Sequence, residues 1–208
     1  MAMESVGAEK RPYHHGNLRQ ALLEEAEAIL EQDGIQALTL RAVARAAGVS
    51  HAAPTNHFGD LAGLLSELAA VGFRRFIVML RTAAAVVGDD PVARARAMDR
   101  AYVDFARTHT GMFLLIFRKE QLDPDWPALR EAGREAMDLL RETAIAAAPE
   151  KARDAHWLAT RMAARWSLVH GFALLAIDQR LDPILMNIPD IDVDDLLGMI
   201  QQKTLFDD

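Results

Sequence analysis

The chain has 208 residues, of which 51% are hydrophobic, and carries a formal net charge of -7. This length and composition allow one or two globular domains with a sizeable core, and the absence of Cys excludes disulfides, thiolate zinc sites and cysteine nucleophiles. The acidic balance argues against a protein that holds nucleic acid through bulk positive charge. Because no run of about 18 apolar residues occurs and the first residues lack an apolar leader, we expect a cytoplasmic protein with no membrane partner.

The first predicted element is an amphipathic helix that opens at Asn17 and ends at Asp33 and Gly34. Its glutamates lie away from an apolar face. That face is formed by Leu18, Leu22, Ala26 and Ile29.

Residues 39–60 are predicted to form two short helices joined by a tight turn. Thr39 can cap the first helix, Gly48 suits the left-handed backbone that ends it, and Ser50 can cap the second helix. The inward stripe of the first helix consists of Leu40, Val43, Ala44 and Ala47. This pattern is typical of a helix-turn-helix, whose second helix enters the major groove of DNA.

The remaining chain also has helical periodicity. A long helix follows Gly59 and Asp60, another begins at Asp90 and Pro91, and a loop at 123–127 leads into a further helix. Residues 151–180 are apolar on nearly every face, and an amphipathic helix ends the chain. No segment alternates like a strand, so we predict an all-α protein of about nine helices.

Enzymatic function is not predicted, because the chain has no Ser-His-Asp ordering with a strained turn, no Gly-rich phosphate loop and no carboxylates at metal-ligand spacing. His14 and His15 resemble a metal-binding pair, but adjacent side chains diverge on most backbones and no third ligand is near. We therefore predict no metal and no cofactor.

The segments LTLRAVARAAGVS, NHFGD and GLL resemble the TetR family of bacterial regulators over residues 13–68. RPYHHGNLRQALL and HAAP resemble one subgroup of that family, and Trp166, His170 and Gly171 are similar to a shorter Trp-His-Gly signature of some ligand domains. The resemblance implies an N-terminal arm (1–15), a three-helix DNA-binding domain (16–62) and a helical-bundle domain for ligand binding and dimerisation (63–208). It also implies a homodimer on a palindromic operator.

A docked second helix faces base edges with its first turns, whereas flanking residues hold phosphates. Tyr13, with Lys10 and Arg11, forms a candidate arm along the DNA backbone or the minor groove. The other candidate DNA-binding residues are Thr39, Arg41, Ser50, His51, Ala52, Thr55, Asn56 and His57. His57 has an alternative role as a cap of its own helix.

Three residues depart from the expected pattern. The family usually carries Tyr at the position of Thr55 and Lys at the position of Leu61, and both usual groups hold phosphate. Pro54 deletes a backbone hydrogen bond if the helix starts at Ser50, so the helix start can lie a residue or two later. Residues 1–60 contain five Lys and Arg against eight Asp and Glu. These features leave open a TetR-fold interaction protein that has lost operator binding.

For the second domain we expect a small apolar or amphipathic effector that releases a repressor from its operator. The candidate ligand-binding residues are His109, Arg118, Trp126, Trp166 and His170, with Arg165 as a further inward polar group. Trp166 can equally be a core residue, His170 can bond a neighbouring helix, and Arg118 can pair with a surface carboxylate. The candidate dimer residues are Leu168, Phe172, Leu175, Leu196 and Ile200, all of which can equally be intramolecular core.

Overall fold

In this computed structural model, which describes residues 18–204, the chain folds into ten α-helices with no strand among the described residues. The predicted all-α fold is confirmed. The helix absent from the prediction of about nine is α9 (Asp182–Leu185), a single turn with Pro183 near its start. No helix in the described range is long and apolar enough to cross a membrane.

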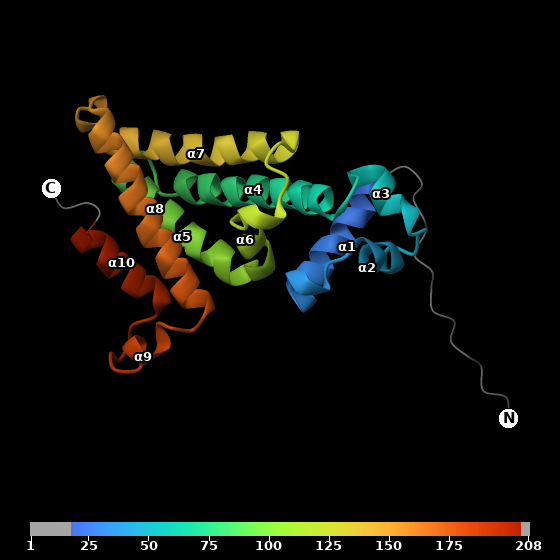
Figure 1. Cartoon of the computed structure of the whole chain (residues 1–208). Helices are drawn as coiled ribbons and strands as arrows, with labels where there is room; N and C mark the ends of the chain where they lie inside the picture. Colours follow the sequence, from blue (N-terminus) through green and yellow to red (C-terminus); the bar gives the residue numbers. More distant parts are fainter. Residues whose placement is uncertain (1–17, 205–208) are drawn as a thin grey trace.

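Three helices form the end of the molecule on the right of Figure 1. They are α1 (Leu18–Asp33), α2 (Leu40–Ala46) and α3 (Ala52–Phe58), with a 3-10 turn at Ile35–Ala37 between the first two. Helix α1 buries Leu22, Leu23, Ala26 and Leu30. Leu18 and Ile29, which were predicted for the same face, are only partly buried and pack against the edge of the core.

Helix α4 (Leu61–Ala85) leads from this small bundle into the rest of the molecule. Asp60 caps it, because its side chain accepts a hydrogen bond of 2.9 Å from the Gly63 backbone N–H. The helix runs unbroken through the predicted domain boundary at residues 62 and 63. A single rigid element therefore joins the two ends of the molecule.

Helices α5, α6 and α7 pack against α4, whereas α8 packs on α5 and α7, and α10 packs on α5. Asp90 and Pro91 start α5 as predicted, and the side chain of Asp154 caps α8. The apolar segment after Thr110 is a short helix, α6, whose large side chains are mostly buried. The bounds are α5 Pro91–Thr108, α6 Thr110–Ile116, α7 Pro127–Ala147, α8 Ala155–Ile177 and α10 Val193–Thr204, with 3-10 turns at Lys119–Gln121 and Lys151–Arg153.

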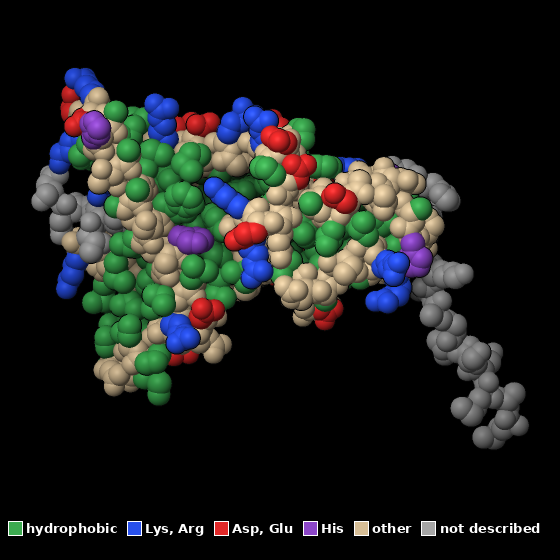
Figure 2. Space-filling view, viewed as in Figure 1, with side chains coloured by type: hydrophobic (Ala, Val, Ile, Leu, Met, Phe, Trp, Pro, Cys, Tyr) green, Lys and Arg blue, Asp and Glu red, His purple; other side chains and the backbone are tan. Residues whose placement is uncertain are grey.

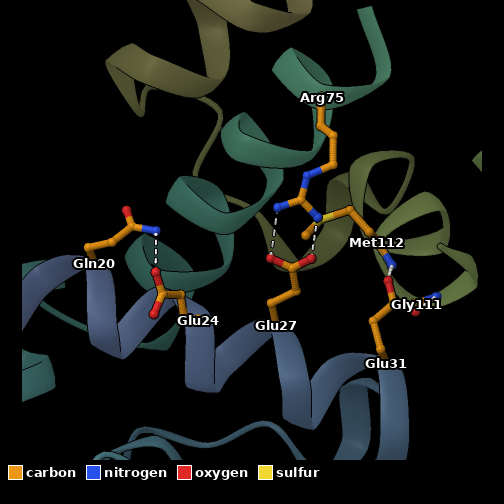
Figure 3. A network of polar contacts seen from close by, with 7 residues as sticks. All are labelled: Gln20, Glu24, Glu27, Glu31, Arg75, Gly111 and Met112. Atoms are coloured by element: carbon orange, nitrogen blue, oxygen red, sulfur yellow. Dashed lines mark hydrogen bonds and ion pairs between the residues drawn. The ribbon is translucent and has the colours of Figure 1, made fainter. Parts of the chain in front are cut away.

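Charged side chains of α1 join the small bundle to the larger one (Figure 3). Arg75 on α4 donates two hydrogen bonds to the Glu27 carboxylate. The Glu31 carboxylate accepts hydrogen bonds from the backbone N–H groups of Gly111 (2.9 Å) and Met112 (3.0 Å) in the first turn of α6. A Cβ at Gly111 would lie 2.7 Å from the Leu30 carbonyl oxygen, so glycine permits this close approach of α6 to α1.

Candidate functional site

The turn between α2 and α3 has the predicted geometry. Gly48 adopts a left-handed backbone with φ of +68°. Its N–H donates to the Arg45 carbonyl (3.2 Å), and the Val49 N–H donates to the Ala44 carbonyl (2.9 Å), which is the Schellman arrangement. At the other end of α2, the Thr39 hydroxyl accepts from the Ala42 N–H at 3.1 Å. Local residues alone therefore fix both ends of α2.

The second helix of the motif begins later than Ser50, and the prediction that Ser50 caps it is wrong. Helix α3 starts at Ala52, after His51, whose side chain forms no cap hydrogen bond. Ser50 contributes only its backbone carbonyl, which accepts from the Ala53 N–H. Pro54 is consequently the third helical residue, where its missing N–H removes no hydrogen bond of the helix.

Helix α3 has a buried face and an exposed face. Ala53, Pro54 and Phe58 are buried against the small bundle. All eight predicted DNA-contact residues in the described range are exposed: Thr39, Arg41, Ser50, His51, Ala52, Thr55, Asn56 and His57. Tyr13, Lys10 and Arg11 of the predicted arm lie outside the described residues, as do His14 and His15.

The exposed face of α3 offers neutral donors and acceptors more than charge. Figure 2 shows Lys or Arg and His side chains over α2 and the turn that leads to α3. No hydrogen bond joins the His57 side chain to another described residue, so a capping role for it has no support. Asn56 presents an amide that can bond an adenine edge bidentately, and the Thr55 methyl can contact a thymine methyl.

A second candidate site is a cavity of about 630 Å³ inside the larger bundle. Its wall is mainly apolar and comes from α4, α5, α6, α7 and α8 and from the segment that precedes α7. Figure 2 shows hydrophobic side chains gathered between α7 and α8 on the face of the molecule that points toward the viewer. A volume of this size suits a drug-sized ligand.

The cavity wall includes a buried ion pair between Asp99 and Arg165. The Asp99 Oδ1 atom lies 2.8 Å from the Arg165 Nε and 2.8 Å from its Nη2, which also donates to the Ala95 carbonyl. The Gln201 side chain donates to Oδ2 at 2.9 Å. Burial raises the pKa of Asp99, and the neighbouring Arg165 guanidinium opposes that rise.

The second polar pair in the wall is formed by Tyr102 and His170, whose hydroxyl and Nδ1 atoms lie 2.8 Å apart. Burial lowers the pKa of His170 and raises the pKa of Tyr102, so both side chains are neutral at neutral pH. Phe117 packs edge-on against His170 with ring centroids 4.6 Å apart. The pair is therefore held inside an aromatic cluster.

The cavity contains only part of the predicted ligand-binding set. Trp166, His170 and Arg165 line it, whereas His109, Arg118 and Trp126 lie outside its wall. His109 packs on Phe105, and Arg118 is exposed. The Trp126 indole N–H donates to the Glu67 carboxylate at 2.7 Å. None of these three residues belongs to this cavity, because His109 packs on Phe105 of the helix that it ends, Arg118 is exposed, and Trp126 is held by Glu67 of α4.

Sequence reasoning missed Tyr102 and Asp99 as site residues. Tyr102 falls at an apolar position in the periodicity of its helix, which hides the role of its hydroxyl, and Asp99 lies three positions earlier. A carboxylate on the buried side of an apolar helical stripe is itself a signal of a polar interior, because such a group needs a partner.

The predicted dimer residues divide between interior and surface. Phe172 is only 5% exposed within one chain, so its assignment to a dimer surface is wrong. Leu168, Leu196 and Ile200 are half-buried, whereas Leu175 is 45% exposed.

Within residues 18–204, no cluster of three or more His, Asp or Glu side chains has the spacing of a metal site.

Comparisons with known proteins cover both ends of the molecule. Residues 22–68 match the family described as "Bacterial regulatory proteins, tetR family", and residues 95–197 match "Tetracyclin repressor-like, C-terminal domain". No curated protein gives a significant match.

Solved structures resemble the whole fold. A protein of unknown function from Rhodococcus sp. RHA1 is 34% identical, with 93% of this chain and 96% of that chain covered and a TM-score of 0.76. The TetR family transcriptional regulator PfmR from Thermus thermophilus is 17% identical, with coverage of 88% and 96% and a TM-score of 0.61. A TetR-family transcriptional regulator from Bordetella parapertussis 12822 is 15% identical, with coverage of 90% and 94% and a TM-score of 0.60. The chain therefore belongs to the TetR family of DNA-binding transcriptional regulators, which are not enzymes.

Proposed function

We propose that this protein is a cytoplasmic repressor that binds a palindromic operator as a homodimer and leaves it when a small apolar or amphipathic effector enters the cavity. The outward face of α3 carries the proposal, because His51, Thr55 and Asn56 are exposed while Phe58 anchors the helix. Two such helices on a symmetric dimer match two half-sites about 34 to 36 Å apart.

A polar junction supports coupling between the cavity and α3. The Glu67 carboxylate on α4 accepts a hydrogen bond from the Trp126 indole (2.7 Å) and pairs with Arg19 of α1 (2.8 Å). Burial raises the pKa of Glu67, but the hydrogen bonds from Arg19 and Trp126 outweigh it and leave that pKa below its ordinary value. Glu67 is therefore ionised and binds both partners at neutral pH.

Both ends of this junction lead to a proposed functional site. The Arg19 guanidinium lies 5.2 Å from the ring centroid of Phe58, the last residue of α3. On the other side, the backbone N–H of Asp123 donates to Ser66 of α4 at 2.8 Å, and its chain neighbours Leu122 and Pro124 line the cavity. A ligand that moves the segment before α7 would pull on Glu67, Arg19 and the end of α3.

The dimer would have two conformations that differ in the spacing of their α3 helices. The ligand changes operator binding only if it binds one of these conformations more tightly than the other. Because the helices must enter successive major grooves, a change of a few ångströms in their spacing would remove most of the operator affinity. Apolar side chains on α8 and α10 provide the proposed dimer surface, since Leu175 and Met199 are 45% and 44% exposed in the single chain.

Selection of duplexes from a random DNA pool by the full-length protein tests operator binding. We expect enrichment of an inverted repeat with half-sites about one helical turn apart. The substitution Thr55→Glu, which places a negative charge on the exposed face of α3, should abolish enrichment. The control is Glu142→Gln, which changes an exposed side chain of α7 and should leave enrichment intact. Failure of the wild-type protein to enrich any sequence would instead favour the interaction protein, for which Thr55 and the half-buried Leu61 are the supporting observations.

A further inference from the structure

The His170 imidazole in the cavity wall has one nitrogen without a partner in the described part of the chain. His170 lines the cavity, and its Nδ1 atom bonds the Tyr102 hydroxyl, but no hydrogen bond reaches its Nε2 atom from a described residue. We propose, building on the regulatory function proposed above, that the effector is an uncharged, ring-bearing molecule with an oxygen that accepts a hydrogen bond from His170 Nε2.

The hydrogen bond to Tyr102 decides which nitrogen of His170 carries the proton. The Tyr102 phenol is 7% exposed, and a buried hydroxyl needs an acceptor for its hydrogen. The His170 Nδ1 atom, at 2.8 Å, is that acceptor. A neutral imidazole that accepts at Nδ1 holds its proton on Nε2, so His170 presents a donor on its remaining nitrogen.

The interior of the cavity favours an uncharged ligand group. Asp99 and Arg165 are 3% and 7% exposed and neutralise each other, and Gln201 and the Ala95 carbonyl take up further hydrogen bonds of the pair. A buried ion from the ligand would find no free counter-ion at this pair, and burial of an unpaired charge is expensive. The other charged side chains in the wall, Lys119 and Arg130, are both exposed and disfavour a cation.

The wall favours a ligand with a ring. Six side chains with aromatic rings line the cavity: Phe73, Phe76, Tyr102, Phe117, Trp166 and His170. Several of these rings meet at an angle, as Tyr102 and Phe76 do with centroids 5.0 Å apart and planes at 84°. Such walls add edge-to-face contacts to the burial of apolar surface.

Fluorescence titration with prodan tests the inference. Prodan is an uncharged naphthalene that carries a dimethylamino group and a ketone, and its emission moves to longer wavelength when the ketone accepts a hydrogen bond. The matched probe is the same naphthalene without the ketone. We expect the wild-type protein to bind prodan about tenfold more tightly than the matched probe, since one hydrogen bond in a mainly apolar site contributes about that factor.

Two variants assign the effect to His170. His170→Phe removes the donor and should reduce the tenfold preference to less than about twofold, with loss of the emission shift. His170→Gln keeps an amide oxygen for Tyr102 and an amide N–H for the ligand, so it should retain the preference and the shift. Circular dichroism tests whether both variants are folded, and His170→Leu, which also removes the donor, replaces His170→Phe if the latter is not.

The outcomes separate the two proposals. Equal binding of both probes by the wild-type protein overturns the hydrogen-bonded ligand class and leaves an apolar effector site in place. A preference for prodan that persists in His170→Phe also overturns it. Failure of the wild-type protein to bind either probe overturns the effector site itself, and the ligand class with it.

Discussion

Single side chains inside the larger bundle place polar groups in the mainly apolar wall of the cavity. Asp99 and Arg165 depend on each other there, because a partner left alone would be an uncompensated buried charge, which typically destabilises a protein by about 3–5 kcal/mol. Tyr102 and His170 form a neutral pair beside them. These two pairs give the cavity its chemical character.

His170 should make stability depend on pH. Burial lowers its pKa in the folded protein below the ordinary 6.5, so the unfolded chain takes up a proton before the folded chain does. The free energy of unfolding should therefore lose this contribution as pH falls below about 6.5 and keep it above that value. Urea unfolding of the wild-type protein and of His170→Gln between pH 5 and pH 8 measures the difference, in which the other titrating groups cancel. A stability difference that does not change with pH would contradict this environment for His170.

Sequence alone predicted the residues whose role depends on near neighbours. Thr39, Gly48, Asp60 and Asp90 act within a few positions of themselves, so their turn and cap geometry follows from local chain chemistry. The partnership of Asp99 with Arg165 could not be predicted in this way. Those residues are 66 positions apart and meet only because α5 packs on α8.

The helix-turn-helix depends on the turn at Gly48. A Cβ at this position would meet nothing within 4 Å, so substitution changes backbone energy without a clash. Gly48→Ala should lower the free energy of unfolding by about 1–2 kcal/mol, because an L-residue is strained at positive φ. Gly133→Ala in α7, which also meets nothing within 4 Å, should leave stability unchanged or raise it by about 0.5–1 kcal/mol. Equal stability of Gly48→Ala and the wild-type protein in urea would contradict the role of the turn.

The junction at Glu67 should couple helices from both parts of the molecule. Trp126→Phe removes the indole N–H that Glu67 accepts and leaves a ring of similar kind. Without the indole, the Glu67 carboxylate is held less firmly in its position against Arg19 of α1. Amide hydrogen exchange should therefore become faster in α1 and α3. Trp157→Phe in α8, away from the junction, is the matched control. Unchanged exchange in α1 and α3 of Trp126→Phe would remove this route from the mechanism.

Element boundaries show where sequence reasoning succeeded and where it stopped. The starts of α2, α4 and α5 carry their own caps and were predicted. The start of α3 was placed at Ser50 because Ser often caps helices. In the structure the Ser50 backbone carbonyl, and not its side chain, accepts a hydrogen bond from the Ala53 N–H. Trp126 was predicted to bind ligand as an inward-facing polar group, but Glu67, 59 positions away, determines where its indole lies.

Net charge applies to the whole molecule. With a formal charge of -7, the protein has no excess of cations to hold DNA at long range. Binding must come from local contacts at α2 and α3, so the affinity for the selected operator should fall with salt along a log-log slope less steep than about -8, given about -0.9 per phosphate neutralised. Fluorescence anisotropy over a range of salt concentrations measures this slope. A steeper slope would require more phosphate contacts than these helices present.

The outward face of α3 is the central claim, and Asn56 tests it most directly. Anisotropy titrations with the selected operator and with single-base variants of it compare the wild-type protein with Asn56→Ala and with the α7 control Glu142→Gln. We predict that Asn56→Ala loses about 1–3 kcal/mol of binding free energy and ceases to discriminate at one base pair of each half-site, whereas the control behaves as the wild-type protein. Undiminished affinity and undiminished base discrimination in Asn56→Ala would contradict the assignment of α3 as the DNA-reading helix.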